Sequence, residues 1–144
     1  MSGETELVHA SCVAIGGRAV LIGGKPGRGK SDLALRLIDR GAALVSDDYT
    51  IVTGDGDRVL AGAPATIAGK IEVRGIGLVE LAAASDVPVC LCVDLDGVPE
   101  RLPETPGSRM VAGVAVPAIA LAGLEASAPI KVERALILFG LPLR

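Results

Sequence analysis

The sequence predicts one α/β domain spanning residues 1–144, and three observations lead to that fold class. A chain of 144 residues is long enough for one compact core without disulfide or metal crosslinks. Its valine-, leucine- and isoleucine-rich segments are short and are separated by glycine, aspartate and proline, which is typical of strands joined by turns. One segment, residues 31–41, instead carries apolar residues at helical spacing directly after a glycine-rich loop.

The first part of the chain predicts a hairpin followed by a helix. Two apolar runs, residues 7–17 and 18–24, meet at Gly16-Gly17, and glycine tolerates the positive φ that a hairpin turn requires. The helix predicted over residues 31–41 has an aspartate in its first turn and ends at Arg40-Gly41.

Further strands are expected beyond that helix. Residues 42–64 indicate short strands that reverse at Gly54–Asp57, because an Asp-Gly pair favours a tight turn. Residues 70–81 and 87–95 are two more strand candidates. Several turn formers close together make residues 100–113 the best candidate for a mobile surface loop.

The C-terminal segment predicts a second helix. Residues 127–140 begin with Ser127 as an N-cap, place Pro129 early and continue with apolar residues at helical spacing. The sequence contains no internal repeat, low-complexity tract or linker-like segment, so all these elements are expected to share one domain.

The composition excludes several classes of partner. The chain is 50% hydrophobic but has one Tyr, one Phe and no Trp, so an aliphatic core is expected and base-stacking surfaces are not. A net charge of −3 gives no broad cationic surface for nucleic acid or acidic membrane. No apolar run approaches the roughly 20 residues of a membrane span, and residues 1–10 lack the pattern of a signal peptide. We therefore expect a cytoplasmic protein that binds neither nucleic acid nor membrane.

The three cysteines, Cys12, Cys90 and Cys92, do not suggest a disulfide framework. Their odd number, and the position of Cys90 and Cys92 inside a strand-like segment, favour reduced thiols packed as small apolar groups. Metal binding by Cys90 and Cys92 is the alternative, although no second ligand pair follows at the spacing of a zinc site.

Residues 24–31, GKPGRGKS, match the pattern G-x-x-x-x-G-K-[ST] between a predicted strand and a predicted helix. Glycines let successive backbone N–H groups turn toward phosphate oxygens, and the N-terminus of the helix adds its positive end. Lys30 is expected to reach the β and γ phosphates of a nucleotide, and Ser31 to offer its hydroxyl to Mg²⁺. The expected nucleotide-binding residues are Gly24, Lys25, Pro26, Gly27, Arg28, Gly29, Lys30 and Ser31. The alternatives are a glycine-rich turn that contains lysine by chance and, for Lys25 and Arg28, a solvated turn.

Two acidic stretches supply candidate catalytic groups. Asp47 and Asp48 follow a predicted strand, and one carboxylate can take a proton from an attacking hydroxyl while the other supports the metal. Glu72 and Arg74 share one face if their segment is a strand, so Glu72 can bind or orient Mg²⁺ and Arg74 can neutralise charge on the transferring group. An acidic turn and a surface ion pair are the alternatives. The spacing of His9, the only histidine, carries no functional signal.

These motifs, in this order, resemble the catalytic domain of HPr kinase/phosphorylase over about residues 9–81. The resemblance rests on the P-loop, the aspartate pair and the E-x-R-G-x-G segment, IEVRGIG. It implies a bacterial kinase that uses ATP and Mg²⁺ to phosphorylate a serine of HPr, the phosphocarrier of the sugar phosphotransferase system, or of a relative. It also implies a mixed sheet with flanking helices, as in the nucleotide-binding core of phosphoenolpyruvate carboxykinase, and a homo-oligomer, expected to be a hexamer.

The resemblance also implies a role for each candidate residue. Asp47 matches the catalytic base, and His9 matches a histidine that lies beside that carboxylate and tunes its proton affinity. Glu72 is expected at the metal, Arg74 at the phosphates, and Asp48 in support. The catalytic set is then Asp47, His9, Lys30 and Arg74, and the metal ligands are Ser31, Glu72 and Asp48.

Three departures from the family limit what the resemblance implies. Lys25 and Pro26 stand where the family has an acidic residue and a serine, which bears on nucleotide affinity. The chain begins almost at His9, as a short, catalytic-domain form would. The arginine of the Gly-Arg-Asn loop linked with dephosphorylation has no clear counterpart; Lys131 could replace it as a point charge but lacks its bidentate fork, so the resemblance supports kinase activity more than phosphorylase activity. Arg101 resembles an arginine of the family's D-R-L-G segment, or is a surface residue.

Two other functions stay open on the same scaffold. A small-molecule kinase or nucleotide hydrolase would use the same P-loop and metal carboxylates without a protein acceptor. A nucleotide-sensing regulatory protein with little turnover would explain the altered P-loop and the missing Gly-Arg-Asn loop. Phosphate transfer to free metabolites would indicate the first, and tight ATP binding without product would indicate the second.

Overall fold

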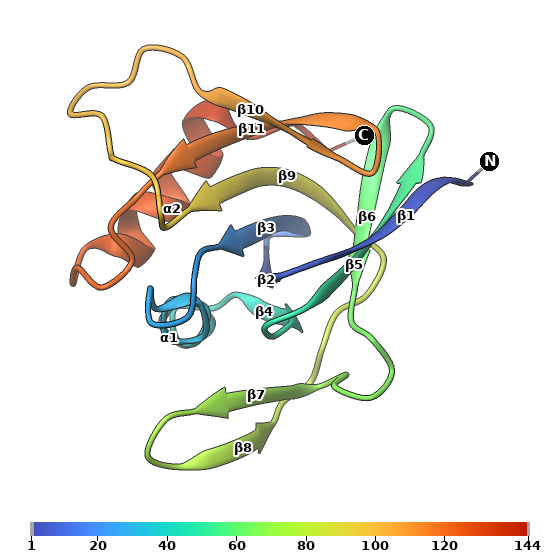
Figure 1. Cartoon of the computed structure of the whole chain (residues 1–144), viewed down its shortest axis with the longest axis vertical. Coiled ribbons are helices and arrows are strands. Elements are labelled where there is room, and N and C mark those ends of the chain that lie inside the picture. The colour runs from blue at the N-terminus through green and yellow to red at the C-terminus, as the bar shows by residue number, and fades with distance from the viewer. Residues whose placement is uncertain (1, 144) are drawn as a thin grey trace.

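The computed structural model describes residues 2–143, which form strands along most of the chain and two helices (Figure 1). The strands are β1 (Ser2–Val8), β2 (Ala10–Ile15), β3 (Arg18–Gly23), β4 (Ala43–Ser46), β5 (Thr50–Asp55), β6 (Arg58–Gly62), β7 (Lys70–Val73), β8 (Gly77–Glu80), β9 (Val87–Asp94), β10 (Gly107–Val111) and β11 (Val114–Ala120). The helices are α1 (Lys30–Asp39) and α2 (Ala128–Phe139).

Nine of the described strands form one mixed sheet, which confirms the expected α/β class with a mixed sheet and flanking helices. The order is β1-β5-β6-β9-β3-β2-β4, and β11 pairs with β9 and carries β10 beside it. Strand β9 runs parallel to both β3 and β11, and the other pairs are antiparallel. β7 and β8 form a separate two-stranded sheet, which extends below α1 in the view of Figure 1.

The large sheet separates two aliphatic cores. Both helices and the β7–β8 sheet pack on one face, where the largest buried side chains include Ile22, Leu33, Leu37, Leu91 and Leu136. The strands enclose the other core, which includes Val8, Leu21, Val52, Val89 and Val116. Burial of this apolar surface is the main source of stability, at about 25 cal/mol per Å². The expectation of a core without large aromatic side chains is confirmed, since the only phenylalanine, Phe139, is partly buried.

The predicted hairpin and both predicted helices are confirmed. Gly16 and Gly17 join β2 to β3 with φ of 58° and 82°, values that favour glycine. Helix α1 buries Leu33 and Leu37 against the sheet. Helix α2 carries Pro129 in its first turn as predicted, but the Ser127 side chain makes no capping hydrogen bond.

Two sequence predictions are wrong in their element assignment. Residues 70–81, predicted as one strand, form the β7–β8 hairpin, because Gly75 and Gly77 adopt φ of 87° and 121° and reverse the chain. Residues 100–113, predicted as a mobile loop, form a loop only in their first half, and β10 then pairs along β11. Residues of β10 form a strand because they pair with β11, and their local sequence pattern did not predict it.

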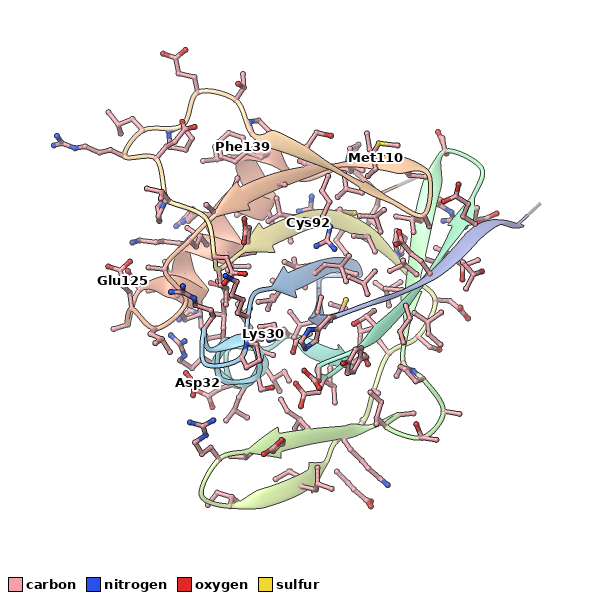
Figure 2. The ribbon with its side chains drawn as sticks, viewed as in Figure 1. Lys30, Asp32, Cys92, Met110, Glu125 and Phe139 are labelled. Carbon is pink, nitrogen blue, oxygen red and sulfur yellow. The ribbon has the colours of Figure 1, made fainter. Side chains whose placement is uncertain are left out.

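The three cysteines are buried free thiols, as expected for small apolar groups. Cys12 and Cys92 belong to the enclosed core, and Cys90 belongs to the core under the helices. Figure 2 shows Cys92 on β9. Within residues 2–143, no helix is long and apolar enough to cross a membrane.

Candidate active site

The P-loop connects the end of β3 to the start of α1, as the motif predicted. Gly29 is the residue before the helix, with φ of 92°, and no side chain caps the first turn. The unpaired backbone N–H groups of that turn, together with the helix dipole, are the usual binding elements for a phosphate. A side chain at Gly29 would be strained at this φ, and its Cβ would lie 2.7 Å from the Leu124 side chain. The local backbone therefore requires glycine at this position.

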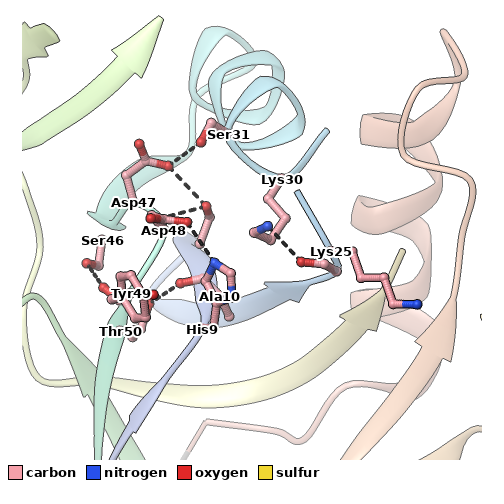
Figure 3. A network of polar contacts seen from close by, with 12 residues as sticks. His9, Ala10, Lys25, Lys30, Ser31, Ser46, Asp47, Asp48, Tyr49 and Thr50 are labelled. Carbon is pink, nitrogen blue, oxygen red and sulfur yellow. Dashed lines mark hydrogen bonds and ion pairs between the residues drawn. The ribbon is translucent and has the colours of Figure 1, made fainter. Parts of the chain in front are cut away.

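Lys30 is buried at the N-terminal end of α1 (Figure 2). Its ammonium group donates a hydrogen bond of 2.7 Å to the carbonyl of Gly24, at the other end of the loop (Figure 3). The Lys30 side chain thus connects the two ends of the loop across its interior. Its ammonium group lies where the motif predicts phosphate oxygens.

Asp96, which follows β9, contacts the side chain of Arg28 and the backbone of Lys25. Arg28 forms an ion pair with this carboxylate, with 3.2 Å between Nε and Oδ1, and the Lys25 N–H donates to both oxygens at 3.1 Å. Asp96 therefore fixes the loop from outside. Arg28 has a carboxylate partner, which corresponds to neither of the two roles considered from the sequence.

Asp47 lies at the centre of the site and is only 7% exposed. Its Oδ1 accepts hydrogen bonds from the hydroxyls of Ser31, at 2.6 Å, and of Ser11, at 3.0 Å. Its Oδ2 accepts the backbone N–H of Glu72 at 3.0 Å. The Asp47 carboxylate therefore accepts hydrogen bonds from three donors, one each on α1, β2 and β7.

Asp48 has a different environment from its neighbour. It is the residue that turns the chain between β4 and β5, with φ of 66°, and its N–H donates to the Ser11 hydroxyl at 3.1 Å. Its side chain is 56% exposed and lies 2.9 Å from Nε2 of His9 (Figure 3). The His9 ring stacks on Tyr49, with 4.8 Å between ring centroids. The sequence resemblance implies a histidine beside Asp47; the side-chain contact that His9 makes in the structure is with the next residue, Asp48, whose left-handed backbone gives its carboxylate a different direction.

A cleft of about 560 Å³ brings most of the predicted residues together. It lies between the P-loop, the aspartate turn and the β7–β8 hairpin. Its lining residues are Pro26, Gly27, Gly29, Lys30, Ser31, Asp32, Leu35, Asp47, Asp48, Glu72, Val73, Arg74 and Leu124. Four predicted residues do not line it: His9, Gly24, Lys25 and Arg28.

The hairpin contributes Glu72 and Arg74 to the cleft, but not as a pair on one strand face. Arg74 lies one residue past β7, in the turn, so the predicted strand alternation does not apply. Among the described residues, no ion pair joins these two side chains. Both side chains are exposed, and both are available to a ligand in the cleft.

The oxygen donors in the cleft fit Mg²⁺. The Ser31 hydroxyl and the Asp47 carboxylate already touch, and Glu72 is held beside them by its backbone hydrogen bond to Asp47. In the described part of the chain, no group of three or more His, Cys, Asp or Glu residues is arranged to hold a metal. Mg²⁺ is usually held by one or two carboxylates together with substrate phosphates and water, so Ser31 and Asp47, with Glu72 beside them, are the residues that could hold it. Asp48, predicted as a metal ligand, instead faces His9.

Sequence reasoning missed Ser11, Asp96 and Tyr49. Each acts through a contact between distant segments, and nothing in its local pattern differs from an ordinary strand or turn residue. Lys131, considered from the sequence as a substitute for the missing arginine, and Arg101, which resembles the D-R-L-G arginine, do not line the cleft. Lys131 pairs with Glu125 at 3.3 Å, and Arg101 lies exposed in the loop before β10.

The comparison with known families decides the assignment. The family model described as HPr Serine kinase C-terminal domain matches residues 2–87, more than half of the chain. The chain belongs to this family. The chain is 35% identical over 129 residues to the HPr kinase/phosphorylase of Streptococcus thermophilus, a match that covers 81% of the chain and 42% of that protein. It is 33% identical over 144 residues to that of Latilactobacillus sakei, covering 91% and 44%.

The fold of this chain also has a solved counterpart. The structure of the Hpr(Ser) kinase/phosphatase from Coxiella burnetii superposes with a TM-score of 0.80 at 26% identity, covering 92% of this chain and 88% of that one. The chain spans less than half the length of the curated relatives it matches.

Proposed function

We propose that this domain is an ATP-dependent protein-serine kinase whose acceptor is HPr or an HPr-like phosphocarrier. One observation carries the proposal: two adjacent carboxylates line the same cleft with different partners, Asp47 the P-loop serine and Asp48 the histidine. A kinase needs a metal-side carboxylate and an acceptor-side base at the same reaction centre. Family membership and the names of the relatives support the same activity.

On the nucleotide side, the loop from Gly24 to Ser31 holds the phosphates of ATP. Its backbone N–H groups and Lys30 surround the anion, and the Ser31 hydroxyl and the Asp47 carboxylate are the ligands for Mg²⁺, with Glu72 beside them. Bound there, Mg²⁺ would supply positive charge beside the phosphates, and the Ser31 hydroxyl and the Asp47 carboxylate would hold it.

On the acceptor side, we assign the base to Asp48, which exchanges the roles that the sequence resemblance gave to the two aspartates. The oxygens of Asp47 already accept three hydrogen bonds, whereas Asp48 is open to the cleft and makes one side-chain contact, with His9. Asp48 removes the proton of the attacking serine, and His9 holds the carboxylate in position. Arg74, across the cleft, stabilises charge on the transferring group.

We also propose that transfer runs mainly toward phosphorylation of the acceptor. The only basic residue considered as a substitute for the missing arginine, Lys131, has its charge engaged with Glu125 outside the cleft. We place the protein in the cytoplasm, where ATP and a phosphocarrier are found together, and we expect it to self-associate. Size-exclusion chromatography with light scattering gives the mass of the assembly, and a monomer at micromolar concentration would contradict self-association.

The experiment that tests the proposed function is mass spectrometry of an HPr-type phosphocarrier after incubation with this protein, ATP and Mg²⁺. We expect one phosphoserine, absent when Lys30→Ala replaces the wild type. Circular dichroism of Lys30→Ala checks that the fold is kept. No phosphate on the phosphocarrier despite ATP binding would overturn the proposal, and phosphate on a free metabolite would indicate the small-molecule kinase instead.

A further inference from the structure

A second cavity, of about 490 Å³, lies next to the candidate active site and has no part in the scheme above. It is formed by β1, by the start of β5 and by the segment between β6 and β7. Its lining residues are Thr5, Glu6, Leu7, Tyr49, Ile51, Pro64, Thr66 and Ile67. Most of this lining is apolar, and none of it is a lysine or an arginine.

Three side chains in contact with one another connect this cavity to the nucleotide cleft. Tyr49 lines the cavity and stacks on His9, and His9 contacts Asp48, which lines the nucleotide cleft. Figure 3 shows Lys30 and Lys25 on one side of Asp48 and Tyr49 on the other. The cavity therefore lies on the side of the candidate base that is away from the P-loop.

The side of the base matters because of the geometry of phosphoryl transfer. The attacking and leaving oxygens lie roughly in line across the transferred group, so the acceptor approaches from the side opposite the nucleotide. An acceptor that reaches Asp48 from that side meets Tyr49 and the cavity behind it. The cavity is thus continuous with the surface that any acceptor must cover.

The chemistry of the cavity selects among ligands. The absence of a cationic residue from its lining makes it unsuitable for the phosphates of a second nucleotide, and the carboxylate of Glu6 already accepts the Ala112 N–H at 2.7 Å. Two apolar side chains of the lining are exposed to solvent: Leu7 is 60% exposed, and Tyr49, the single tyrosine of the chain, is 41% exposed. Exposed apolar side chains around a hollow next to a reaction centre are typical of a specificity pocket.

We propose that this cavity receives an apolar side chain of the phosphoacceptor polypeptide, close in space to the serine that is phosphorylated. The inference rests on the proposed kinase function and extends it, because it assigns the docking pocket that distinguishes a protein acceptor from a small molecule. Burying one large aliphatic side chain contributes about 1.5–3 kcal/mol, so an emptied or blocked pocket should weaken acceptor binding about tenfold or more.

Two variants test the pocket from opposite directions. Leu7→Ser removes an exposed apolar wall, and Thr66→Trp fills the cavity from an exposed turn without removing any core side chain. Leu138→Ser is the matched control, because Leu138 is also an exposed leucine but lies on α2. Steady-state phosphorylation of the phosphocarrier gives KM for the acceptor, KM for ATP and kcat.

We expect both pocket variants to raise KM for the acceptor about tenfold with KM for ATP and kcat nearly unchanged, and Leu138→Ser to match the wild type. If the wild type is active and the pocket variants keep its acceptor KM, the pocket proposal is overturned and the kinase function stands. An effect on KM for ATP alone would also overturn it. If the wild type does not phosphorylate the phosphocarrier, the proposed function fails and the docking proposal fails with it.

Discussion

Asp47 and Asp48 are consecutive in the sequence but have different surroundings. The left-handed backbone conformation of Asp48 changes the direction of the chain after β4. The Asp47 side chain therefore points inward to Ser31, and the Asp48 side chain points outward to His9. A positive φ is uncommon outside glycine, and aspartate is among the residues that tolerate it best. The separation of the two carboxylates therefore depends on one backbone conformation.

This separation predicts different phenotypes for the two Asn variants. Asp48→Asn removes the base and keeps the shape, so phosphoryl transfer should fall about 10²–10⁴-fold while ATP binding stays within about twofold. Asp47→Asn replaces one accepting oxygen by an NH2 group, so at least one of the three donors at Asp47 loses its acceptor; this lowers stability by about 1–3 kcal/mol and weakens the metal site. We expect that variant to need more Mg²⁺ for the same rate.

Single-turnover phosphorylation measured across a Mg²⁺ titration separates the two effects. Thermal unfolding of each variant accounts for loss of fold. If Asp48→Asn keeps full activity and Asp47→Asn loses it at every Mg²⁺ concentration, the base is Asp47, as the sequence resemblance implied.

At the scale of elements, the β7–β8 hairpin is the part of the site that sequence reasoning described least well. The alternation of apolar and polar side chains over residues 70–81 suggests one strand. The chain reverses instead, because two glycines in this segment adopt positive φ and glycine weakens a strand. The consequence is that Arg74 extends from a turn into the cleft, where its position depends on the hairpin and not on strand alternation.

The hairpin predicts a specific role for its arginine. Arg74→Ala should lower kcat about 10²–10³-fold with little change in KM for ATP, because the guanidinium acts on charge that develops during transfer. Arg74→Lys should restore only part of the activity, since lysine lacks the planar fork. Lys70→Ala is the control: it removes an exposed cation from the same hairpin, but that residue does not line the cleft. Equal losses in Arg74→Ala and Lys70→Ala, measured by steady-state kinetics, would indicate a general effect of charge.

What the sequence predicted correctly was local. The P-loop is a continuous motif whose strand, glycines and helix all lie within residues 18–39, so its conformation follows from the chain itself. The His9–Asp48 contact joins residues 39 apart, and Ser11 reaches Asp47 across 36. β1 and β10 were missed for the same reason: they are strands because of their partners β5 and β11, not because of their own composition.

At the scale of the whole molecule, the sheet places titratable thiols in both of its apolar cores. Burial raises the pKa of Cys92 from the ordinary 9.0 to about 11, although the nearby Arg109 opposes this. Burial, with a smaller contribution from Cys92, raises the pKa of Cys12 well above its usual range, and burial also raises the pKa of Cys90. The folded protein therefore keeps protons that the unfolded chain releases as the pH rises above about 9.

The sign of this linkage predicts that stability falls at alkaline pH. A thiol whose folded pKa is raised contributes stability that is fully present below the unfolded pKa, so the free energy of unfolding should decrease from about pH 9 to pH 11 by up to about 1.4 kcal/mol per pH unit for each thiol. Urea unfolding at pH 8, 9 and 10 measures it, with Cys92→Ala as the comparison. The variant starts less stable because it leaves a small cavity, but it lacks this titration, so its deficit relative to the wild type should shrink as the pH rises. A stability deficit that stays constant across these three pH values would mean that burial does not raise the pKa of the Cys92 thiol.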